Sequence, residues 1–340
     1  MKAVGYKKSL PISDVSSLID IELPTPIAKG HDLLIQVKAV SVNPVDFKVR
    51  QNMTPQTSEY KILGWDAVGE AVAVGSEVSL FQPGDLVYYA GDLMRDGSNA
   101  EYQLVDERIV GKKPKSLTDA QAASLPLTSI TAYELLFDHL SIQRTEENQP
   151  SGNEVLLVMG AAGGVGSILI QLAKALTNAT VIASASRASS IEWVKSLGAD
   201  HVIDHSKPIA AQISQLKIGE VTHIAGLTHT DSYFNDYIEL IKPKGTIAII
   251  DDPQSLDISK IKLKSIAFHW EFMFTRSMFN TDDMIEQHKL LNHVSELIDQ
   301  GRIINTVGKH FGKINAANLK SAHELLESGK SIGKIVLEEF

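Results

Sequence analysis

The chain contains no cysteine among its 340 residues. This absence excludes disulfide bonds, catalysis by a thiolate and zinc held by cysteine sulfur. The sequence also has no run of like charges, no low-complexity segment and no short-period repeat. Its net charge of −9 at pH 7 disfavours nucleic acid as a partner, because a phosphate backbone is bound by a surplus of lysine and arginine.

Long apolar runs are equally scarce. The first ten residues, MKAVGYKKSL, lack the apolar core of a secretory leader. The most apolar window, 155–173, is about as long as a spanning helix, but glycines interrupt it. A strand, a turn and a helix explain the same residues better. We therefore expect a soluble, cytoplasmic protein without a membrane partner.

The length of the chain favours two domains, and its patterning divides it in the same way. Short strand-like runs such as AVGEAVAVGSEV and DLVYYAGD dominate the first 115 residues or so. Thr118 then has the position of an N-cap for a helix at DAQAAS, and LTSITAYELLFDHL continues with helical spacing.

From residue 154 strands alternate with helices, beginning with NEVLLVMG and GVGSILIQLAKALT and ending with a sixth candidate strand, KSIAFHW. This alternation predicts a doubly wound parallel sheet. The remaining residues contain a helix at 282–300, a strand-like RIINTV, a helix at 318–328 and a closing strand, GKIVLEE. The two mostly β flanks can form one domain, with the α/β unit inserted between them.

A glycine-rich turn, VMGAAGGVGS, joins the first strand of the α/β unit to its first helix. Against the G-x-G-x-x-G fingerprint, Ala161 takes the first position, Gly163 the second and Gly166 the third, with Gly164 and Val165 between them. Such a turn lets a diphosphate approach the backbone at the amino end of a helix. The lysine of a Walker phosphate loop is absent. A dinucleotide is therefore the predicted ligand, with a purely structural turn as the alternative.

The next strand ends in SASR, without the carboxylate that NAD-preferring sites use to bind the ribose 2′-hydroxyl. Ser184, Ser186 and Arg187 are present instead. Hydroxyls and a guanidinium suit a 2′-phosphate, so we expect NADPH as the cofactor. The alternative for Arg187 is a solvated arginine in the first turn of a helix.

These segments together resemble the medium-chain dehydrogenase/reductase superfamily, in its zinc-free quinone oxidoreductase (zeta-crystallin-like) branch, whose members are often labelled zinc-type alcohol dehydrogenase-like. The resemblance covers essentially the whole chain and includes AVSVNPVDFKVR, LGWDAVGEAVAVG, LPLTSITAYELL, AAGGVGS and GKIVL. It implies a GroES-like, mostly β catalytic domain over 1–125 and 271–340, and a Rossmann NADPH-binding domain over 126–270. It also implies a homodimer.

The same resemblance bears on metal binding. Zinc-binding members carry a cysteine where this chain has Asn43, and a His-Glu pair where it has Trp65 and Asp66. An amide and an indole are poor zinc ligands, and the histidines show no ligand-like spacing, although His201 and His205 are expected on one strand. We expect no metal.

The resemblance places Asn43, Phe47 and Thr128 around the nicotinamide and the substrate. The Asn43 amide and the Thr128 hydroxyl could hold a carboxamide or donate to a carbonyl oxygen, although Thr128 could equally be the N-cap of its helix. Trp65 would form an apolar wall or belong to the core. For Asp46, a hydrogen-bond anchor after Pro44 is favoured over a general acid.

Further candidates come from the loops that follow strands of a parallel sheet, where ligands bind. These loops nominate Leu227 and Asp251, and by resemblance His205 could approach the 2′-phosphate, with a plain surface histidine as the alternative. Phe272 and Met273 belong to an aromatic and methionine-rich stretch, 269–279, that either lines an acceptor pocket or forms interdomain or subunit core.

Without a metal, little is left to polarise an alcohol, so the reduction of an electron-poor acceptor is the expected activity. We expect a metal-independent, NADPH-dependent reductase of quinones or α,β-unsaturated carbonyls. The alternatives are an alcohol dehydrogenase-like activity on another substrate and a non-catalytic redox sensor that binds NADPH.

Overall fold

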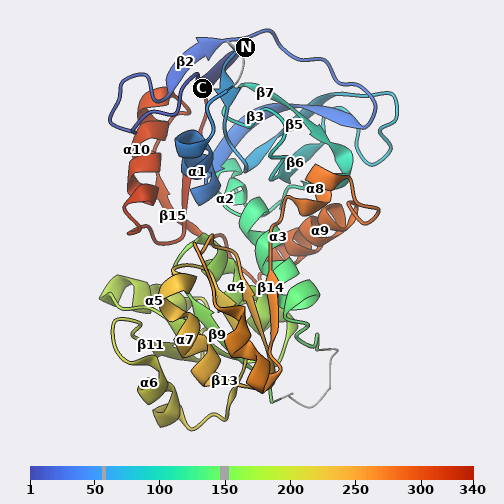
Figure 1. The fold of residues 1–340 in the computed structure, drawn as a ribbon. Helices are drawn as coiled ribbons and strands as arrows, with labels where there is room; N and C mark the ends of the chain where they lie inside the picture. Colours follow the sequence, from blue (N-terminus) through green and yellow to red (C-terminus); the bar gives the residue numbers. More distant parts are fainter. Residues whose placement is uncertain (56–58, 146–152) are drawn as a thin grey trace. The chain divides into compact units, whose positions relative to one another are not determined.

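The computed structural model describes residues 1–55, 59–145 and 153–340. The chain divides into two compact units, each described here by itself (Figure 1). Unit 1 comprises Met1–Ile130 and Phe274–Phe340, and unit 2 comprises Thr131–Met273. The second unit is thus inserted into the first.

Unit 1 is built mainly of antiparallel β-structure. Its strands are β1 (Lys2–Tyr6), β2 (Ile19–Glu22), β3 (Asp32–Val42), β4 (Lys61–Ile62), β5 (Ala67–Val74), β6 (Leu86–Tyr89), β7 (Tyr102–Asp106), β8 (Val110–Lys112), β15 (Val307–His310) and β16 (Lys334–Glu338). One sheet has the order β15-β16-β3-β5-β6-β8, with β7 also paired to β3, and a smaller sheet has the order β2-β1-β4. The long strand β3 therefore pairs with β16, from the other end of the chain, and with β5.

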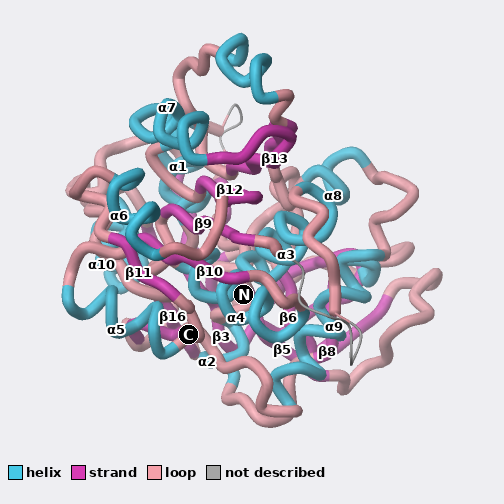
Figure 2. The backbone as a smooth tube through the Cα atoms, turned by 90° about the horizontal axis from the view of Figure 1, so that it is seen from below, coloured by secondary structure: helices cyan, strands magenta, loops and turns pink. Residues whose placement is uncertain are grey.

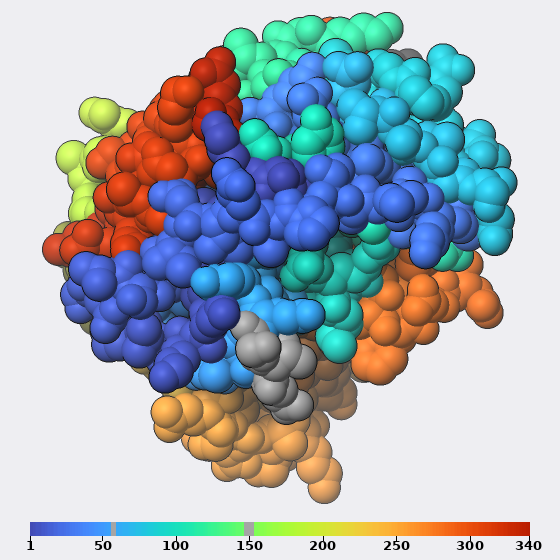
Figure 3. All heavy atoms as spheres, turned by 90° about the horizontal axis from the view of Figure 1, so that it is seen from above, coloured from blue at the N-terminus to red at the C-terminus, as the bar shows by residue number. Residues whose placement is uncertain are grey.

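Helices close the ends of this unit. They are α1 (Pro44–Asn52), α2 (Asp119–Ala123), α3 (Pro126–Glu134, which carries the chain into unit 2), α8 (Thr275–Phe279), α9 (Glu286–Asp299) and α10 (Ala316–Glu327). On the face shown in Figure 3, the N-terminal segment lies beside the C-terminal one, and the Ala316 amide donates to Asp20 Oδ1 at 2.8 Å. The predicted N-cap is confirmed, because Thr118 accepts from the Gln121 amide and forms a capping box with it.

Unit 2 contains a six-stranded sheet, of which Figure 2 labels β9 to β13 in magenta. Every pair of neighbouring strands in this sheet is parallel. Its strands are β9 (Val155–Met159), β10 (Thr180–Ser184), β11 (His201–Ile203), β12 (Val221–Gly226), β13 (Ile241–Ile249) and β14 (Ala267–Trp270). In the order β11-β10-β9-β12-β13-β14, the chain first adds strands on one side of β9 and then returns to add β12, β13 and β14 on its other side. This is the doubly wound order expected from the sequence, and KSIAFHW does supply its sixth strand.

The connecting helices cover the sheet because each buries one apolar face. They are α4 (Gly164–Leu176), α5 (Ala188–Ser196), α6 (Ile209–Leu216) and α7 (Thr230–Leu240). Residues of α6 and α7, among them Ile213 and Phe234, share one hydrophobic core with Leu157 and Ile224 of the sheet. Helices α4 and α5 are joined by a hydrogen bond from Trp193 Nε1 to Ser167 Oγ at 2.8 Å.

Two local expectations are wrong, and a third is confirmed with a change of helix type at its end. The segment RIINTV is not a strand up to residue 306, because Thr306 bonds through its amide and its hydroxyl to Ser124 instead of to a sheet. The helix expected over LTSITAYELLFDHL is α3 followed by a π-helical turn, Leu135–His139. Strand β11 ends at Ile203, so His205 lies in the following turn and not on a strand with His201.

Candidate active site

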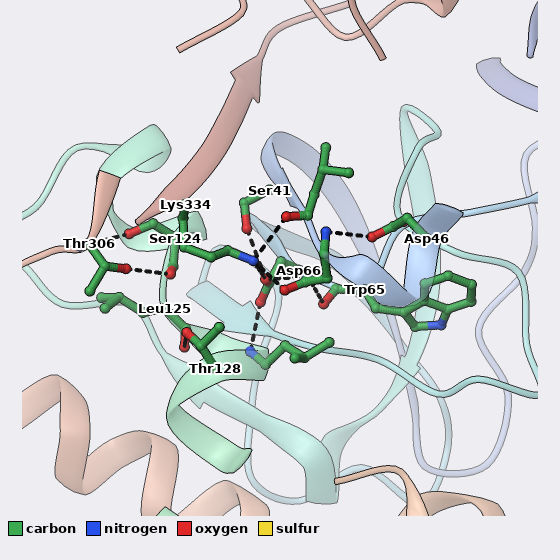
Figure 4. A network of polar contacts seen from close by, with 12 residues as sticks. Ser41, Asp46, Trp65, Asp66, Ser124, Leu125, Thr128, Thr306 and Lys334 are labelled. Carbon is green, nitrogen blue, oxygen red and sulfur yellow. Dashed lines mark hydrogen bonds and ion pairs between the residues drawn. The ribbon is translucent and has the colours of Figure 1, made fainter. Parts of the chain in front are cut away.

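The polar centre of unit 1 is the carboxylate of Asp66, which is fully buried. Its Oδ2 accepts hydrogen bonds from Lys334 Nζ (2.9 Å), Asn43 Nδ2 (2.7 Å) and Ser41 Oγ (2.9 Å) (Figure 4). Its Oδ1 accepts from the backbone amide of Leu127 at 2.7 Å. We call these five residues the Asp66 cluster.

Four segments of the chain bring the cluster together. Ser41 lies near the end of β3, Asn43 precedes α1, and Asp66 precedes β5. Lys334 is the first residue of β16, and Leu127 is in the first turn of α3. The antiparallel pairing of β3 with both β5 and β16 is what aligns these ends.

The Lys334 ammonium is the cation of the cluster and is only 3% exposed. It donates to Asp66 Oδ2, to the Val42 carbonyl at 3.2 Å and to Asn43 Oδ1. Because an ammonium has three hydrogens, these contacts satisfy it completely. The charge is balanced by Asp66, and breaking such a buried pair from one side typically costs about 3–5 kcal/mol.

The amide of Asn43 is fixed by its neighbours. Its Oδ1 accepts from Lys334, and its Nδ2 donates to Asp66 Oδ2 and to the Trp65 carbonyl at 3.3 Å. The two ends of the amide are distinguished because an ammonium can only donate and a carboxylate can only accept. Both Nδ2 hydrogens are directed at protein acceptors, so the donation to a ligand considered from the sequence would have to displace one of them.

Thr128 and Phe47 lie on two helices, α3 and α1, that begin next to residues of the cluster. The Thr128 hydroxyl is buried and donates to the Leu125 carbonyl at 3.1 Å, which leaves its oxygen as an acceptor. Because α3 begins at Pro126, Thr128 lies in its first turn, and the alternative that it is the N-cap is wrong. Phe47 lies on α1 and is half-buried.

Trp65 lies in the core of unit 1. Its ring is fully buried, meets Phe274 edge to face with the centroids 6.2 Å apart, and donates from Nε1 to the Asp92 carbonyl at 3.3 Å. This placement favours the core role over the apolar wall. Phe272 and Met273 belong to unit 2, where Phe272 is 47% exposed and Met273 is buried.

Asp46 stands beside the cluster as a second buried carboxyl group. Its Oδ2 accepts from the Asn43 backbone amide at 2.7 Å, which confirms the hydrogen-bond anchor predicted from the sequence. Its Oδ1 has no hydrogen-bond partner. Burial raises the pKa of Asp46 to about 7, an effect that the nearby Lys334 partly opposes.

The residues of the cluster do not fit a zinc ion. Zinc prefers thiolate, imidazole and carboxylate ligands in a tetrahedral array. Here Asn43 and Trp65 stand at the positions of two ligands, and the one carboxylate already faces an ammonium. Within 1–55, 59–145 and 153–340, no group of three or more histidine, aspartate or glutamate side chains is placed to hold a metal.

In unit 2, the sheet brings the candidate cofactor residues to one edge. Because all its strands are parallel, their carboxyl ends share that edge. The residues that follow these ends are Ala161, Gly163, Gly164, Val165 and Gly166 after β9, Ser184, Ser186 and Arg187 at and after β10, His205 after β11, Leu227 after β12 and Asp251 after β13.

In the glycine turn between β9 and α4, Ala161 occupies the first position of the fingerprint. Gly160 supplies the left-handed backbone instead, with φ of +80°, and its amide donates to Ser184 Oγ at 2.9 Å. Gly163 is the N-cap of α4. Ser184 is buried, and its hydrogen bond with Gly160 fixes the turn to the end of β10.

The ends of β10 and β11 meet through Ser186 and His205, whose Oγ and Nε2 are 3.3 Å apart. Arg187 is exposed and is the N-cap residue of α5. Asp251 has a structural task, since its two carboxylate oxygens accept from the Thr230 amide and hydroxyl at 2.8 and 2.5 Å and anchor the start of α7. Leu227 donates its amide to the Met159 carbonyl at 3.1 Å.

Two family models match the chain. Residues 29–115 match the alcohol dehydrogenase GroES-like domain, and residues 164–292 match the zinc-binding dehydrogenase family. A zinc-type alcohol dehydrogenase-like protein of Staphylococcus epidermidis is 40% identical over 338 residues, which cover 99% of each chain. A crystal structure from Rhizobium etli, named for a resemblance to zinc-dependent alcohol dehydrogenases, is 54% identical to this chain with a TM-score of 0.95. The alignment covers 100% of this chain and 98% of the Rhizobium chain.

Two reductases are more distant. The quinone oxidoreductase of Coxiella burnetii is 26% identical with a TM-score of 0.80, and the alignment covers 100% of this chain and 99% of that one. The 2-methylene-furan-3-one reductase of Solanum lycopersicum is 40% identical over 221 residues, which are 61% of this chain and 53% of the tomato protein.

The fold is therefore a GroES-like domain with an inserted Rossmann domain, as the resemblance implied. The chain belongs to the medium-chain dehydrogenase/reductase superfamily, in its quinone oxidoreductase-like branch, and is an oxidoreductase of that family. In the part of the chain that the structure describes, no helix combines the length and the apolarity needed to cross a bilayer.

The sequence did not reveal Lys334 and Ser41 as members of the site. One signal was present: Lys334 opens an apolar run, KIVL, and Asp66 interrupts another, where an unpaired charge would be costly. Two opposite charges in apolar strands suggest a buried pair, but which pair forms depends on strand neighbours that the sequence does not specify.

Proposed function

We propose that this protein is an NADPH-dependent, metal-independent reductase that transfers hydride to a quinone or an α,β-unsaturated carbonyl compound. The observation that carries the proposal is the donor set of the Asp66 cluster. Asn43 and Trp65 carry an amide and a neutral indole at two positions where zinc-binding relatives have ligands, and the carboxylate at the third, Asp66, is paired with the Lys334 ammonium. Such a set offers no Lewis acid to an alcohol, whereas an electron-poor acceptor can take hydride without one.

NADPH supplies a hydride from its nicotinamide ring, and the acceptor becomes an enolate or a phenolate that then gains a proton. The chain's own task is to position the acceptor and to stabilise the negative oxygen by hydrogen bonds. Asn43, Phe47 and Thr128 are our candidates for this task. Phe47 presents an aromatic surface to a planar acceptor. To donate to the negative oxygen, the Asn43 amide would give up its 3.3 Å bond to the Trp65 carbonyl, or the Thr128 hydroxyl its 3.1 Å bond to the Leu125 carbonyl.

The preference for NADPH is supported by the edge residues of unit 2. The end of β10 carries no carboxylate. Ser186 and His205 are in contact there, and Arg187 follows Ser186 in the sequence. A negative 2′-phosphate would meet one cation and two hydrogen-bonding groups. Charge-assisted hydrogen bonds of this kind are each worth roughly 1.5–3 kcal/mol.

A homodimer remains part of the proposal. Strand β14 ends the sheet of unit 2, and among the described residues no strand pairs with its outer edge. Trp270, at the end of this strand, is 54% exposed. An open edge with an exposed aromatic residue is suited to pairing with a second copy, and light scattering would measure the mass in solution.

The deciding experiment mixes the protein with NADPH and follows the loss of nicotinamide absorbance with 1,4-naphthoquinone and then with a medium-chain 2-alkenal. Turnover with either acceptor, together with turnover after removal of metal ions, supports the reductase. Saturable NADPH binding without turnover would favour the non-catalytic sensor. Oxidation of alcohols that depends on added zinc would favour the alcohol dehydrogenase alternative.

A further inference from the structure

Lys334 contributes the only charge that faces Asp66 within hydrogen-bonding distance among the described residues, and it reaches the cluster from the last strand of the chain (Figure 4). Its Nζ contacts Asn43 and Asp66, two of the positions at which zinc-binding relatives carry other residues. The positive charge at this point of unit 1 is therefore that of a lysine side chain and not that of a metal ion.

The ammonium determines the orientation of the Asn43 amide. Turning the amide by half a rotation would place Nδ2 against the ammonium of Lys334 and Oδ1 against the carboxylate of Asp66. Donor would then face donor and acceptor would face acceptor, and in a buried site each unmade hydrogen bond costs about 1–3 kcal/mol. Lys334 and Asp66 therefore hold Asn43 in one orientation.

The cluster also controls the first turn of α3. The first amides of a helix have no acceptor within the helix, and here Asp66 Oδ1 accepts from Leu127 at 2.7 Å. The negative charge of Asp66 also interacts favourably with the positive, amino-terminal end of the helix dipole. Thr128 follows Leu127 directly, so the position of its hydroxyl depends on the same carboxylate.

We propose that Lys334 is a positioning residue for the reductase reaction, and that its ammonium serves as the internal cation that orients Asn43 directly and the first turn of α3 through Asp66. The inference rests on the proposed function. In this proposal a lysine of the C-terminal strand organises the acceptor site. The ammonium would fix the geometry of Asn43, a residue that stands at a zinc-ligand position but does not suit zinc.

A purely structural role is the competing explanation, in which Lys334 only fastens β16 to β3 and β5. The two roles differ in what a charge-neutral replacement of the pair does. Lys334→Met alone would leave the Asp66 carboxylate unpaired, and such a variant could fail to fold. The double variant Lys334→Met/Asp66→Asn removes both charges, so its stability can be restored while the orientation of Asn43 is lost.

The test compares the wild type, the double variant, Lys334→Arg and a control, Lys38→Met. Lys38 on β3 forms a partly exposed ion pair with Glu70 on β5, with Nζ and Oε2 3.1 Å apart, and neither residue belongs to the cluster. For each protein we would measure kcat and KM for the acceptor, the Kd for NADPH without acceptor, and the thermal midpoint. The protection of the Asn43 side-chain amide from hydrogen exchange would be followed by NMR, with Asn43→Ala for the assignment.

Positioning predicts that the double variant stays folded and binds NADPH within about threefold of the wild type, while kcat/KM for the acceptor falls by about ten- to a hundredfold, as expected for one lost charged hydrogen bond. Protection of the Asn43 amide is lost as well. Lys334→Arg keeps the charge but not the compact donor geometry, so it should recover part of the activity. Lys38→Met should behave as the wild type.

The proposal is overturned if the folded double variant keeps kcat/KM within about twofold of the wild type, or if the Asn43 amide stays protected in it. It is also overturned if the double variant loses NADPH affinity and acceptor turnover in parallel, because a general distortion then explains both. If the wild type turns over no acceptor, the proposed function fails, and the NMR measurement alone decides whether Lys334 orients Asn43.

Discussion

Lys334 and Asp66 are 268 residues apart in the sequence, and their ammonium and carboxylate groups lie 2.9 Å apart in the core of unit 1. Both side chains are almost completely shielded from solvent. Removing one partner of such a pair leaves a buried charge without compensation and is strongly destabilising. Here the pair joins the last strand of the chain to the segments that carry Asn43 and Thr128.

The glycine turn allows a test of its two roles with matched variants. A methyl group at Gly166 would lie 2.4 Å from the Ala161 carbonyl oxygen, so Gly166→Ala should destabilise unit 2 by about 1–3 kcal/mol. At Gly163 the nearest atom would be 3.5 Å away and φ is −74°, so Gly163→Ala should fold normally.

The Gly163 methyl group would instead occupy the path of the diphosphate, and we expect NADPH affinity to fall by about tenfold or more. Thermal unfolding without cofactor and fluorescence titration with NADPH measure the two effects separately. Unchanged affinity in Gly163→Ala would show that the diphosphate binds elsewhere.

Arg187→Ala tests the choice of cofactor. Loss of the guanidinium should raise the KM for NADPH by about ten- to a hundredfold and leave the KM for NADH nearly unchanged, because only the 2′-phosphate is charged. Steady-state kinetics with both cofactors provides the measurement. Equal losses with the two cofactors would contradict the assignment of Arg187 to the 2′-phosphate.

Asp46 should make unit 1 more stable in mild acid. Its folded pKa of about 7 lies above that of an unfolded aspartate, so between these values the folded state holds a proton that the unfolded chain has released. This contribution is complete below the unfolded pKa and is lost as pH rises towards about 7, by roughly 2 kcal/mol between pH 5 and pH 7. Asp46→Asn removes it, and denaturant unfolding at several pH values would reveal a flat difference if the assignment were incorrect.

His323 should act in the opposite direction. It is buried on α10, accepts from Arg50 Nε at 3.4 Å, and has a pKa lowered to about 3 by burial and by the Arg50 charge. The unfolded chain therefore binds a proton below about pH 6.5 that the folded state does not, and stability falls by about 2 kcal/mol on acidification to pH 5.

His323→Gln keeps an acceptor for Arg50 and does not titrate, so this variant should lose less stability in acid than the wild type. The contributions of Asp46 and His323 to the free energy of unfolding change in opposite directions between pH 7 and pH 5. In the wild type they should therefore nearly cancel, and each single variant should show the pH dependence of the group that remains. Parallel pH profiles of the two variants would contradict both assignments.

Chelation tests the absence of a catalytic metal. Dialysis against EDTA should leave NADPH oxidation unchanged, since the Asp66 cluster presents an ammonium and an amide where a metal would need ligands. Metal analysis before and after dialysis provides the control. Activity that is lost on chelation and regained with zinc would refute the metal-independent mechanism.

The fold was largely predictable because its signals are local. Alternating strands and helices from residue 154 onward predicted the parallel sheet, and Thr118 identified a helix start. The errors arose where distant contacts override local preference. Thr306 pairs with Ser124, 182 residues away, and so the strand expected at RIINTV begins only at Val307.

The candidate site was predictable in part. Asn43, Trp65 and Asp66 stood out by comparison with zinc-binding relatives, and the edge residues of unit 2 followed from the rule that ligands bind at the carboxyl ends of parallel strands. Lys334 did not stand out, because its partner is specified by the pairing of β16 with β3 and not by any neighbour in the sequence.

The sequence by itself determined which chemistry is available: no thiolate, a glycine turn before a helix, and no carboxylate at the end of the second strand of the sheet. The tertiary structure decided how the polar groups are used. It directs both hydrogens of the Asn43 amide to protein acceptors, places Ser184 beneath the Gly160 amide, and brings a lysine from the last strand against Asp66. Residue identity sets the donors and acceptors a chain carries, but only packing decides which of them meet.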